Sequence, residues 1–309
     1  MAERSNIDVE VDYRSSHSTV GGSSVQNSRT TRDYGLTEEE ENDVNAITVS
    51  ITDPSPVVVL FGAGESGKTM TLVRLTRYLL KNGYQVEPDR IFRPSNSKRY
   101  QERCDTFINS VNSDSAPGRT NKLNFMLIKV MNKHGEPICQ ILEAPGEHYF
   151  KADDPEQDFP PYIKRICNIN NPKTWVFIVE KDWETPATRA NYTNRILAME
   201  GLIESEDKII FTCHKADKHK SLFSGGVPNT TQFFREIENQ YAGIFRKYQN
   251  QNPITSLFYK YKFDFLVFSA GSFNKKTEQD GETYTPGKDK YPEKLWSTIL
   301  KNVKGSWFK

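Results

Sequence analysis

Cysteine is scarce in this chain, and the few cysteines are scattered. The 309 residues contain four, with no two in a C-x-x-C pair: Cys104, Cys139, Cys167 and Cys213. Zinc sites and disulfide frameworks need closely or regularly spaced cysteines, so this distribution argues against both. It is typical of a protein from a reducing compartment, and we expect a cytoplasmic location.

Long apolar runs and an excess of one charge are also missing. Lysine and arginine number 41 against 40 aspartates and glutamates, which gives a net charge of +1. The composition therefore offers no reason to expect nucleic acid or an anionic membrane surface as a partner. No apolar run approaches the roughly 20 residues of a bilayer span. The polar N-terminus, MAERSNIDVEVDY, is not a secretory signal, and we expect no transmembrane segment.

The first 45 residues differ in composition from the rest. They are rich in Ser, Thr, Asn and Arg, and the acidic run Glu38–Glu41 lies near their end. Such a segment cannot bury enough apolar surface to offset the entropy lost on ordering it. We predict that residues 1–45 form a disordered or loosely ordered tail and that residues 46–309 form one domain. A solvated tail is favoured over a tether or a partner-binding arm.

From residue 47 onward, strand and helix patterns alternate, which predicts an α/β fold with a mainly parallel sheet. Strands are expected at Val57–Phe61, Leu123–Met131, Pro137–Leu142, Trp175–Val179, Lys208–Cys213 and Phe263–Phe268. Helices are expected at Thr69–Leu80, Arg99–Val111, Ala190–Leu202, through the apolar positions from Phe233 to Tyr248, and around Leu295–Val303. We interpret the apolar stripes of these helices as core.

The stretch VVVLFGAGESGKTM, residues 57–70, carries the most information. It fits G-x-x-x-x-G-K-[ST] with Gly62, Gly67, Lys68 and Thr69, between a buried strand and a helix, as the motif requires. Glycines let the loop curl so that its amides, at the positive end of a helix dipole, point at phosphate oxygens. Lys68 would then neutralise the β- and γ-phosphates, and the Thr69 hydroxyl would bind Mg²⁺. This P-loop predicts binding of a nucleoside triphosphate.

The strand after the hairpin turn ends in LEAPGEH, residues 142–148. Together with the P-loop, this motif resembles the TRAFAC class of P-loop GTPases, the Ras-like, Gα and translation-factor proteins, whose third strand ends in D-x-x-G followed by Gln or His. The resemblance implies that Glu143 holds Mg²⁺ through water and that the Gly146 amide senses the γ-phosphate. It also implies that Glu147 or His148 positions the attacking water. Two residues depart from the pattern: Glu143 replaces Asp, and Glu147 replaces Gln.

Two later strands end in HKAD, residues 214–217, and SAG, residues 269–271. These resemble N-K-x-D and S-A-x, the guanine-recognition motifs of the same class. The resemblance implies that Asp217 accepts hydrogen bonds from guanine, that the Lys215 stem packs over the base, and that the Ser269–Ala270 loop contacts guanine O6. Adenine presents no such donors, so Asp217 would be left unpaired against it. His214 stands where the motif has Asn, and we expect this change to remove an amide that ties the loop to the P-loop.

The first switch of such a protein needs a threonine before the hairpin, and Thr120 is the candidate, as a further Mg²⁺ ligand. The chain between the P-loop helix and Thr120 is longer than a minimal Ras-like switch, so we predict an insert at about residues 84–119 that forms a lid or a partner surface.

The resemblance covers roughly residues 55–305 and implies a Ras-like P-loop NTPase fold. That fold has a mainly parallel six-stranded sheet with one antiparallel edge strand and helices on both faces. The pairing of a P-G-E switch with a long first-switch insert looks more like the divergent bacterial proteins of double-GTPase systems. The expected nucleotide-binding residues are Gly62, Gly64, Glu65, Ser66, Gly67, Lys68, Thr69, Met70, Gly146, Lys215, Asp217, Ser269 and Ala270.

The function implied is a molecular switch that binds GTP or GDP with Mg²⁺ and slowly hydrolyses GTP, regulated by or acting on a partner protein. Lys68, Glu147 and His148 are the expected catalytic residues, and Thr69, Thr120 and Glu143 the metal-binding ones. Two alternatives stay open. The departures at Glu143 and Glu147 fit a nucleotide-bound scaffold that does not hydrolyse, and the P-loop alone fits an ATP-dependent NTPase.

Overall fold

A seven-stranded sheet organises the chain in the computed structural model, which describes residues 36–94, 97–112, 125–252, 260–275 and 282–307. The strands are β1 (Val57–Phe61), β2 (Gln85–Pro88), β3 (Met126–Met131), β4 (Pro137–Glu143), β5 (Lys173–Glu180), β6 (Lys208–His214) and β9 (Asp264–Val267). Their order in space is β2-β3-β4-β1-β5-β6-β9. Within this sheet β3 alone runs against the others.

This architecture confirms the predicted α/β, Ras-like fold class, with two differences. The sheet has seven strands rather than six, and the antiparallel strand β3 is not at the edge, because β2 pairs with its outer side. β2 is short, largely exposed and polar, and it has a neighbour on one side only. It therefore lacks the apolar alternation by which a strand is recognised in a sequence.

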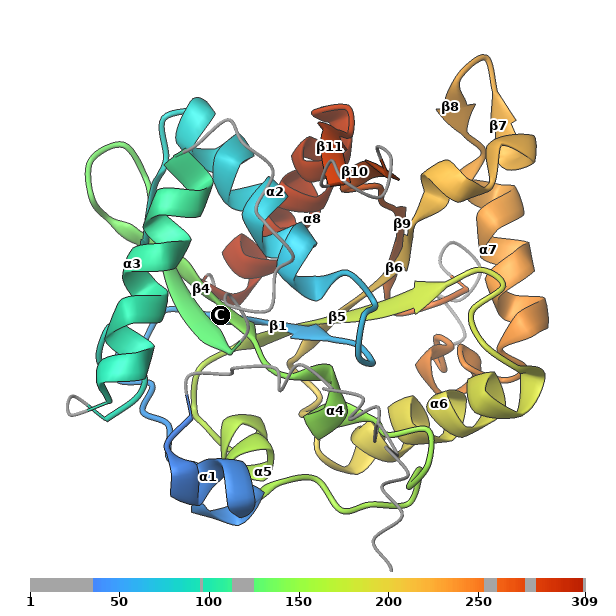
Figure 1. The fold of residues 1–309 in the computed structure, drawn as a ribbon. Coiled ribbons are helices and arrows are strands. Elements are labelled where there is room, and N and C mark those ends of the chain that lie inside the picture. The colour runs from blue at the N-terminus through green and yellow to red at the C-terminus, as the bar shows by residue number, and fades with distance from the viewer. Residues whose placement is uncertain (1–35, 95–96, 113–124, 253–259, 276–281, 308–309) are drawn as a thin grey trace, which may run out of the picture. The chain divides into compact units, whose positions relative to one another are not determined.

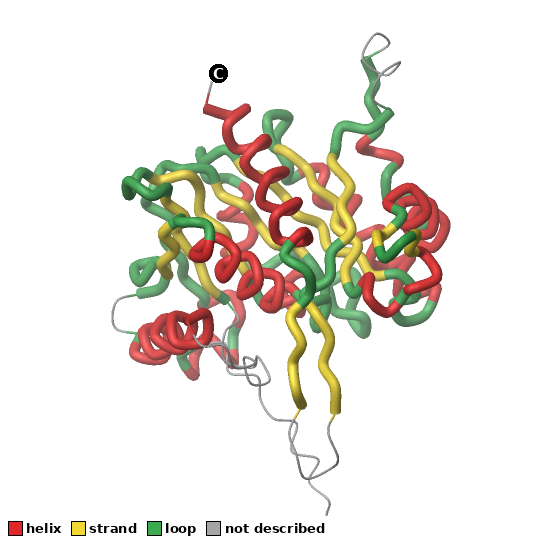
Figure 2. The backbone as a smooth tube through the Cα atoms, turned by 90° about the horizontal axis from the view of Figure 1, so that it is seen from above, coloured by secondary structure: helices red, strands yellow, loops and turns green. Residues whose placement is uncertain are grey.

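Helices cover both faces of the sheet (Figures 1 and 2). The helices are α1 (Glu38–Asn42), α2 (Lys68–Lys81), α3 (Lys98–Asn112), α4 (Gly146–Tyr149), α5 (Pro161–Cys167), α6 (Pro186–Ala198), α7 (Thr230–Gln240) and α8 (Lys290–Trp307). On one face α2 packs against α8, and on the other lie α4, α5 and α6 (Figure 1). Two small hairpins complete the fold: β7 (Phe223–Ser224) with β8 (Val227–Pro228), and β10 (Gly271–Lys275) with β11 (Glu282–Pro286).

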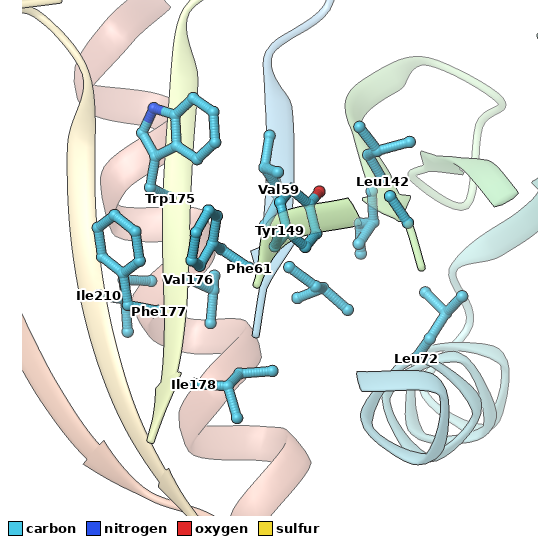
Figure 3. Close-up of a cluster of buried hydrophobic side chains, with 14 of the residues drawn as sticks. Val59, Phe61, Leu72, Leu142, Tyr149, Trp175, Val176, Phe177, Ile178 and Ile210 are labelled. Atoms are coloured by element: carbon cyan, nitrogen blue, oxygen red, sulfur yellow. The ribbon is translucent and has the colours of Figure 1, made fainter. Parts of the chain in front are cut away.

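The core is densest around β1 and β5, which are buried along their whole length (Figure 3). The Phe61 ring at the end of β1 lies 5.2 Å from the Phe177 ring of β5 and 4.4 Å from the Tyr149 ring of α4. Leu72 of α2 is fully buried nearby. This packing holds the starts of α2 and α4 close to the end of β1, where the predicted motifs lie.

The aromatic helix expected through Tyr248 ends sooner than predicted. α7 stops at Gln240, because Tyr241 leaves the helical region of φ/ψ space (φ −116°, ψ 65°) and Gly243 takes φ +84°. Phe245 and Tyr248 follow in a turn and a 3₁₀ segment, and both are still buried. Their interpretation as core was right, but the continuous helix was wrong.

The described end of the predicted tail is folded onto the domain. Helix α1 begins with a capping box, in which the Thr37 amide donates to the Glu40 carboxylate at 2.9 Å and the Thr37 hydroxyl accepts from the Glu40 amide at 3.3 Å. Leu36 and Ile47 are buried in the core. The expectation of a loose tail up to residue 45 is therefore wrong from residue 36 onward, and residues 1–35 lie outside the described part. No helix in the described part of the chain has the length and apolar character needed to cross a bilayer.

Candidate functional site

The P-loop, residues 62–67, joins the end of β1 to the start of α2. Gly67 is the N-cap of α2 with φ +91°, and it offers no side-chain acceptor to the first-turn amides of the helix. A Cβ on Gly62 would lie 2.5 Å from Ser66 Oγ and 3.2 Å from Ile178 Cβ, so a side chain there would displace its neighbours. The helix dipole and these amides make the start of α2 suited to an anion. Met70, also predicted at the site, is buried in the first turn of α2.

Lys68 occupies the inside of the loop. Its ammonium donates to the carbonyl oxygens of Gly62 and Ala63, each at 3.0 Å, and the side chain is buried. A buried cation next to a helix N-terminus is at a disadvantage unless an anion accompanies it. The Lys68 ammonium thus lies where it would neutralise the phosphate oxygens of a bound nucleotide.

The two described metal-ligand candidates lie side by side. The Thr69 hydroxyl donates to Glu143 Oε1 at 3.2 Å, and the Phe125 amide donates to Glu143 Oε2 at 2.7 Å. Burial raises the pKa of Glu143, and the charge of Lys68 opposes that shift. A hydroxyl and a carboxylate are hard oxygen ligands that suit Mg²⁺. Among the described residues there is no group of three or more His, Cys, Asp or Glu that could hold a metal ion.

Gly146 brings the second switch motif against the P-loop. It is the first residue of α4, and a Cβ built on it would lie 2.3 Å from the Gly64 nitrogen and 2.5 Å from the Ala63 oxygen. The two backbones therefore touch, which only glycine permits at this position. A rearrangement of α4 would act directly on the phosphate loop.

The structure separates the two residues predicted to position water. A cavity of about 620 Å³ borders the first part of the P-loop and is lined by Gly64, Glu65 and Glu147 among others, but not by His148. His148 Nδ1 instead lies 2.7 Å from the Tyr162 hydroxyl, and its ring packs edge-on against Phe125. Burial lowers the pKa of His148 to about 4, so its ring is neutral near pH 7. Of the two, Glu147 is the one that faces the cavity.

His214 keeps a tie to the P-loop that we expected it to lose. Its Nδ1 lies 3.2 Å from the Ser66 carbonyl oxygen, and its ring stacks on Phe268 with the centroids 5.0 Å apart. Burial lowers the pKa of His214 to about 3, so the imidazole is neutral and Nδ1–H is the donor to the carbonyl. The replacement of Asn by His changes the donor rather than removing it, because the longer ring reaches the same loop.

This contact predicts the effect of two substitutions. His214→Leu removes the donor and leaves the buried Ser66 carbonyl unpaired, which costs about 1–3 kcal/mol, and we expect nucleotide affinity to fall about tenfold or more. His214→Asn retains an amide donor, and its affinity should stay within about threefold of wild type. Dissociation rates of a fluorescent GDP analogue measure both. Equal effects of the two variants would contradict the assigned donor role.

The two predicted base-recognition motifs lie together at the ends of β6 and β9. The Ser269 hydroxyl donates to Asp217 Oδ1 at 2.5 Å, and the Ala216 amide donates to the Phe268 carbonyl at 3.3 Å. Lys215, which adopts φ +51°, lines the cavity, and its ammonium pairs with Glu180 at 2.5 Å. Sequence reasoning missed Glu180. Its position at the carboxyl end of β5, beside the motif strand, was the available signal.

The loop that contains Ala270 is braced by the β10–β11 hairpin. The Ala270 carbonyl accepts from the Tyr284 hydroxyl at 2.5 Å and from the Gly287 amide at 3.0 Å. Arg74 of α2 donates to the Gly287 carbonyl at 2.7 Å and pairs with Asp289 at 3.2 Å. Hydrogen bonds and an ion pair thus connect the P-loop helix to the predicted base loop. Nothing in the motifs signalled this, because the partners are more than 200 residues apart in the chain.

Thr120, the predicted ligand of the first switch, lies outside the described residues. The predicted insert contains β2 and α3. Arg77 of α2 donates to the Ser110 carbonyl of α3 at 2.7 Å, so this helix is attached to the P-loop helix.

Comparisons with known proteins give structural likenesses only. No protein-family model matches the chain, and no curated protein does. Among solved structures, it is similar to a nucleolar GTP-binding protein 1 from Plasmodium falciparum, with 14% identity and a TM-score of 0.42, over 84% of this chain and 94% of that one. The S. cerevisiae Ski7 GTPase-like domain bound to GTP matches with 12% identity and a TM-score of 0.42, over 89% and 53%.

A third match is the signal recognition particle receptor SRb-GTP/SRX complex from Chaetomium thermophilum, with 10% identity and a TM-score of 0.38, over 81% of this chain and 99% of that one. These three solved proteins are GTP-binding proteins or carry a GTPase-like domain. At such TM-scores and identities the likenesses carry no argument about this chain. The conclusions about this chain rest on its own strand order and site geometry.

Proposed function

We propose that this chain is a guanine-nucleotide-binding switch protein that binds GTP and GDP with Mg²⁺ and hydrolyses GTP slowly. The observation that carries the proposal is the convergence of four motifs at the carboxyl ends of four parallel strands of one sheet. Glu143 ends β4, the P-loop follows β1, and Asp217 and Ser269 follow β6 and β9. This edge of an open parallel sheet is where such folds bind ligands.

Each motif has a chemical task in this proposal. Lys68 and the amides at the start of α2 neutralise and orient the phosphates, and Thr69 and Glu143 hold the metal ion. Asp217, oriented by Ser269, accepts hydrogen bonds from the base. The contact between Gly146 and Gly64 links the phosphate loop to α4, the element that would respond to loss of the γ-phosphate.

Titrations with fluorescent GTP and ATP analogues test the binding claim. We expect GTP to bind at least about 100-fold more tightly than ATP, because adenine leaves the Asp217 carboxylate without donors. Equal or stronger ATP binding would favour the ATP-dependent alternative. Analysis of the nucleotide released when protein purified from cells is denatured gives an independent answer.

Asp217→Asn should change which base is preferred. Asparagine presents an amide donor toward the C2 substituent, which opposes the 2-amino group of guanine and matches the 2-oxo group of xanthine, so GTP affinity should fall by about two orders of magnitude, whereas affinity for xanthosine triphosphate should rise. Competition binding with the two nucleotides measures the exchange of preference. Asp264→Asn, at the start of the edge strand β9 and paired with Lys301, is the control, and its preference should stay with GTP. A uniform loss for both nucleotides would contradict base recognition by Asp217.

A scaffold that binds nucleotide without hydrolysing it is the second candidate function. The observation that favours it is the acidic side chain of Glu147 in the cavity, next to Gly64. A carboxylate there would repel the γ-phosphate and compete with the alignment of a lytic water. Single-turnover assays on GTP-loaded protein separate the two functions, since intact GTP after hours would select the scaffold.

A further inference from the structure

The N-terminal segment reaches the candidate metal site through a buried ion pair. Glu40 of α1 pairs with Arg93, and the two side chains are only 7% and 1% exposed. Glu40 also accepts from the amides of Thr37 and Thr48, and Arg93 donates to the Thr48 carbonyl. Charges buried this deeply depend on each other, so loss of Glu40 would leave Arg93 as an uncompensated buried charge.

Arg93 in turn covers Phe125. The guanidinium carbon lies 5.2 Å from the centre of the Phe125 ring, a cation–π contact shielded from water. Phe125 is fully buried and adopts φ +68°, a left-handed conformation that is unfavourable for a side chain of this size. Such a conformation persists only where its surroundings fix it, and Phe92 and Tyr162 complete the cage at 5.7 and 5.1 Å.

The strained backbone of Phe125 has one evident consequence. It aims the Phe125 amide at Glu143, which accepts it at 2.7 Å through Oε2 and leaves Oε1 facing the Thr69 hydroxyl. The carboxylate predicted to hold Mg²⁺ is thus oriented by a backbone amide. That amide is itself fixed by the side chains around the Phe125 ring.

We propose that Arg93 is a positioning residue for the metal-binding carboxylate, acting through Phe125, and that the α1 segment controls it through Glu40. The Mg²⁺ part of this inference rests on the proposed function, whereas the orientation of the Phe125 amide does not. Any partner or modification that lifts α1 from the domain would loosen Glu143 and weaken Mg²⁺-dependent nucleotide binding. The segment before the P-loop strand is then a regulatory element of the nucleotide site.

Glu40→Gln in the full chain tests the proposal, with Glu41→Gln as its matched control. Both remove one charge from α1, but Glu41 pairs with Arg99 at the exposed surface. Hydrogen exchange of the Phe125 amide in nucleotide-free protein should quicken about tenfold or more in Glu40→Gln and stay unchanged in Glu41→Gln. The Phe268 amide, bonded to the Cys213 carbonyl elsewhere in the sheet, reports whether the effect is local. Its exchange should change far less.

The second measurement is the Mg²⁺ concentration that gives half-maximal retention of a fluorescent GDP analogue. It should rise about tenfold in Glu40→Gln, while affinity measured in EDTA stays the same. If Glu40→Gln does not fold, Arg93→Lys keeps the buried charge but not the flat contact with the ring, and should change both readouts in the same direction.

An unchanged Phe125 amide, or equal acceleration of the Phe125 and Phe268 amides, would overturn the inference. Absence of nucleotide binding in the wild type would instead overturn the proposed function. The exchange measurement would still decide the role of Arg93 in that case.

Discussion

Lys68→Ala is expected to remove nucleotide binding while leaving the fold intact. In the structure the ammonium is buried and donates to two P-loop carbonyls at 3.0 Å, so it lies inside the curl where phosphates would be held. In the nucleotide complex the ammonium would donate to phosphate oxygens, and loss of two such charge-assisted hydrogen bonds costs about 3–6 kcal/mol, or at least about 100-fold in affinity. Isothermal titration with GTP and GDP measures the loss directly.

The matched control is Lys81→Ala, at the other end of the same helix. Lys81 is mostly exposed and pairs with Asp289 at the surface, an interaction worth at most about 1 kcal/mol. Its GTP affinity should stay within about twofold of wild type. Circular dichroism and thermal unfolding of both variants separate lost binding from lost structure. Wild-type affinity in a folded Lys68→Ala variant would contradict the P-loop interpretation itself.

Local sequence patterns were sufficient for the parts of the site that depend on backbone conformation. Gly62, Gly67 and Gly146 each occupy a place where a Cβ would collide or where φ is positive, and a glycine in a motif signals such a place. The buried strands could also be predicted from the sequence, because β1 is apolar throughout and β5 is apolar from Trp175 to Val179.

Contacts between distant residues could not be predicted in the same way. The run Glu38–Glu41 has the composition of a solvated tail, and only the fold reveals that Glu40 meets Arg93 in the interior. His214 was expected to break a link to the P-loop, yet the fold brings its ring to Ser66. Helical periodicity through Tyr248 was misleading because α7 ends at Gln240, while the aromatic side chains that follow stay buried.

Gly146→Ala should weaken nucleotide binding by displacing the phosphate loop. The added Cβ would lie 2.3 Å from the Gly64 nitrogen and 2.4 Å from the Ala63 carbonyl carbon. Both are backbone atoms, which cannot rotate away as a flexible side chain does, so α4 or the P-loop must move. Forcing a methyl group into a packed interior typically costs about 1–3 kcal/mol, and here the displaced atoms belong to the phosphate loop.

Gly201→Ala supplies the control for this prediction, because it adds the same methyl group where no atom lies within 4 Å. That variant should bind nucleotide like the wild type. In Gly146→Ala, GTP affinity should fall by about tenfold or more, since a shifted P-loop misaligns the Gly64 backbone and the amides of α2 together. Titration calorimetry on the two variants measures the difference. Equal GTP affinity in both variants would contradict the contact between α4 and the phosphate loop. It would also contradict the proposed link between α4 and the nucleotide.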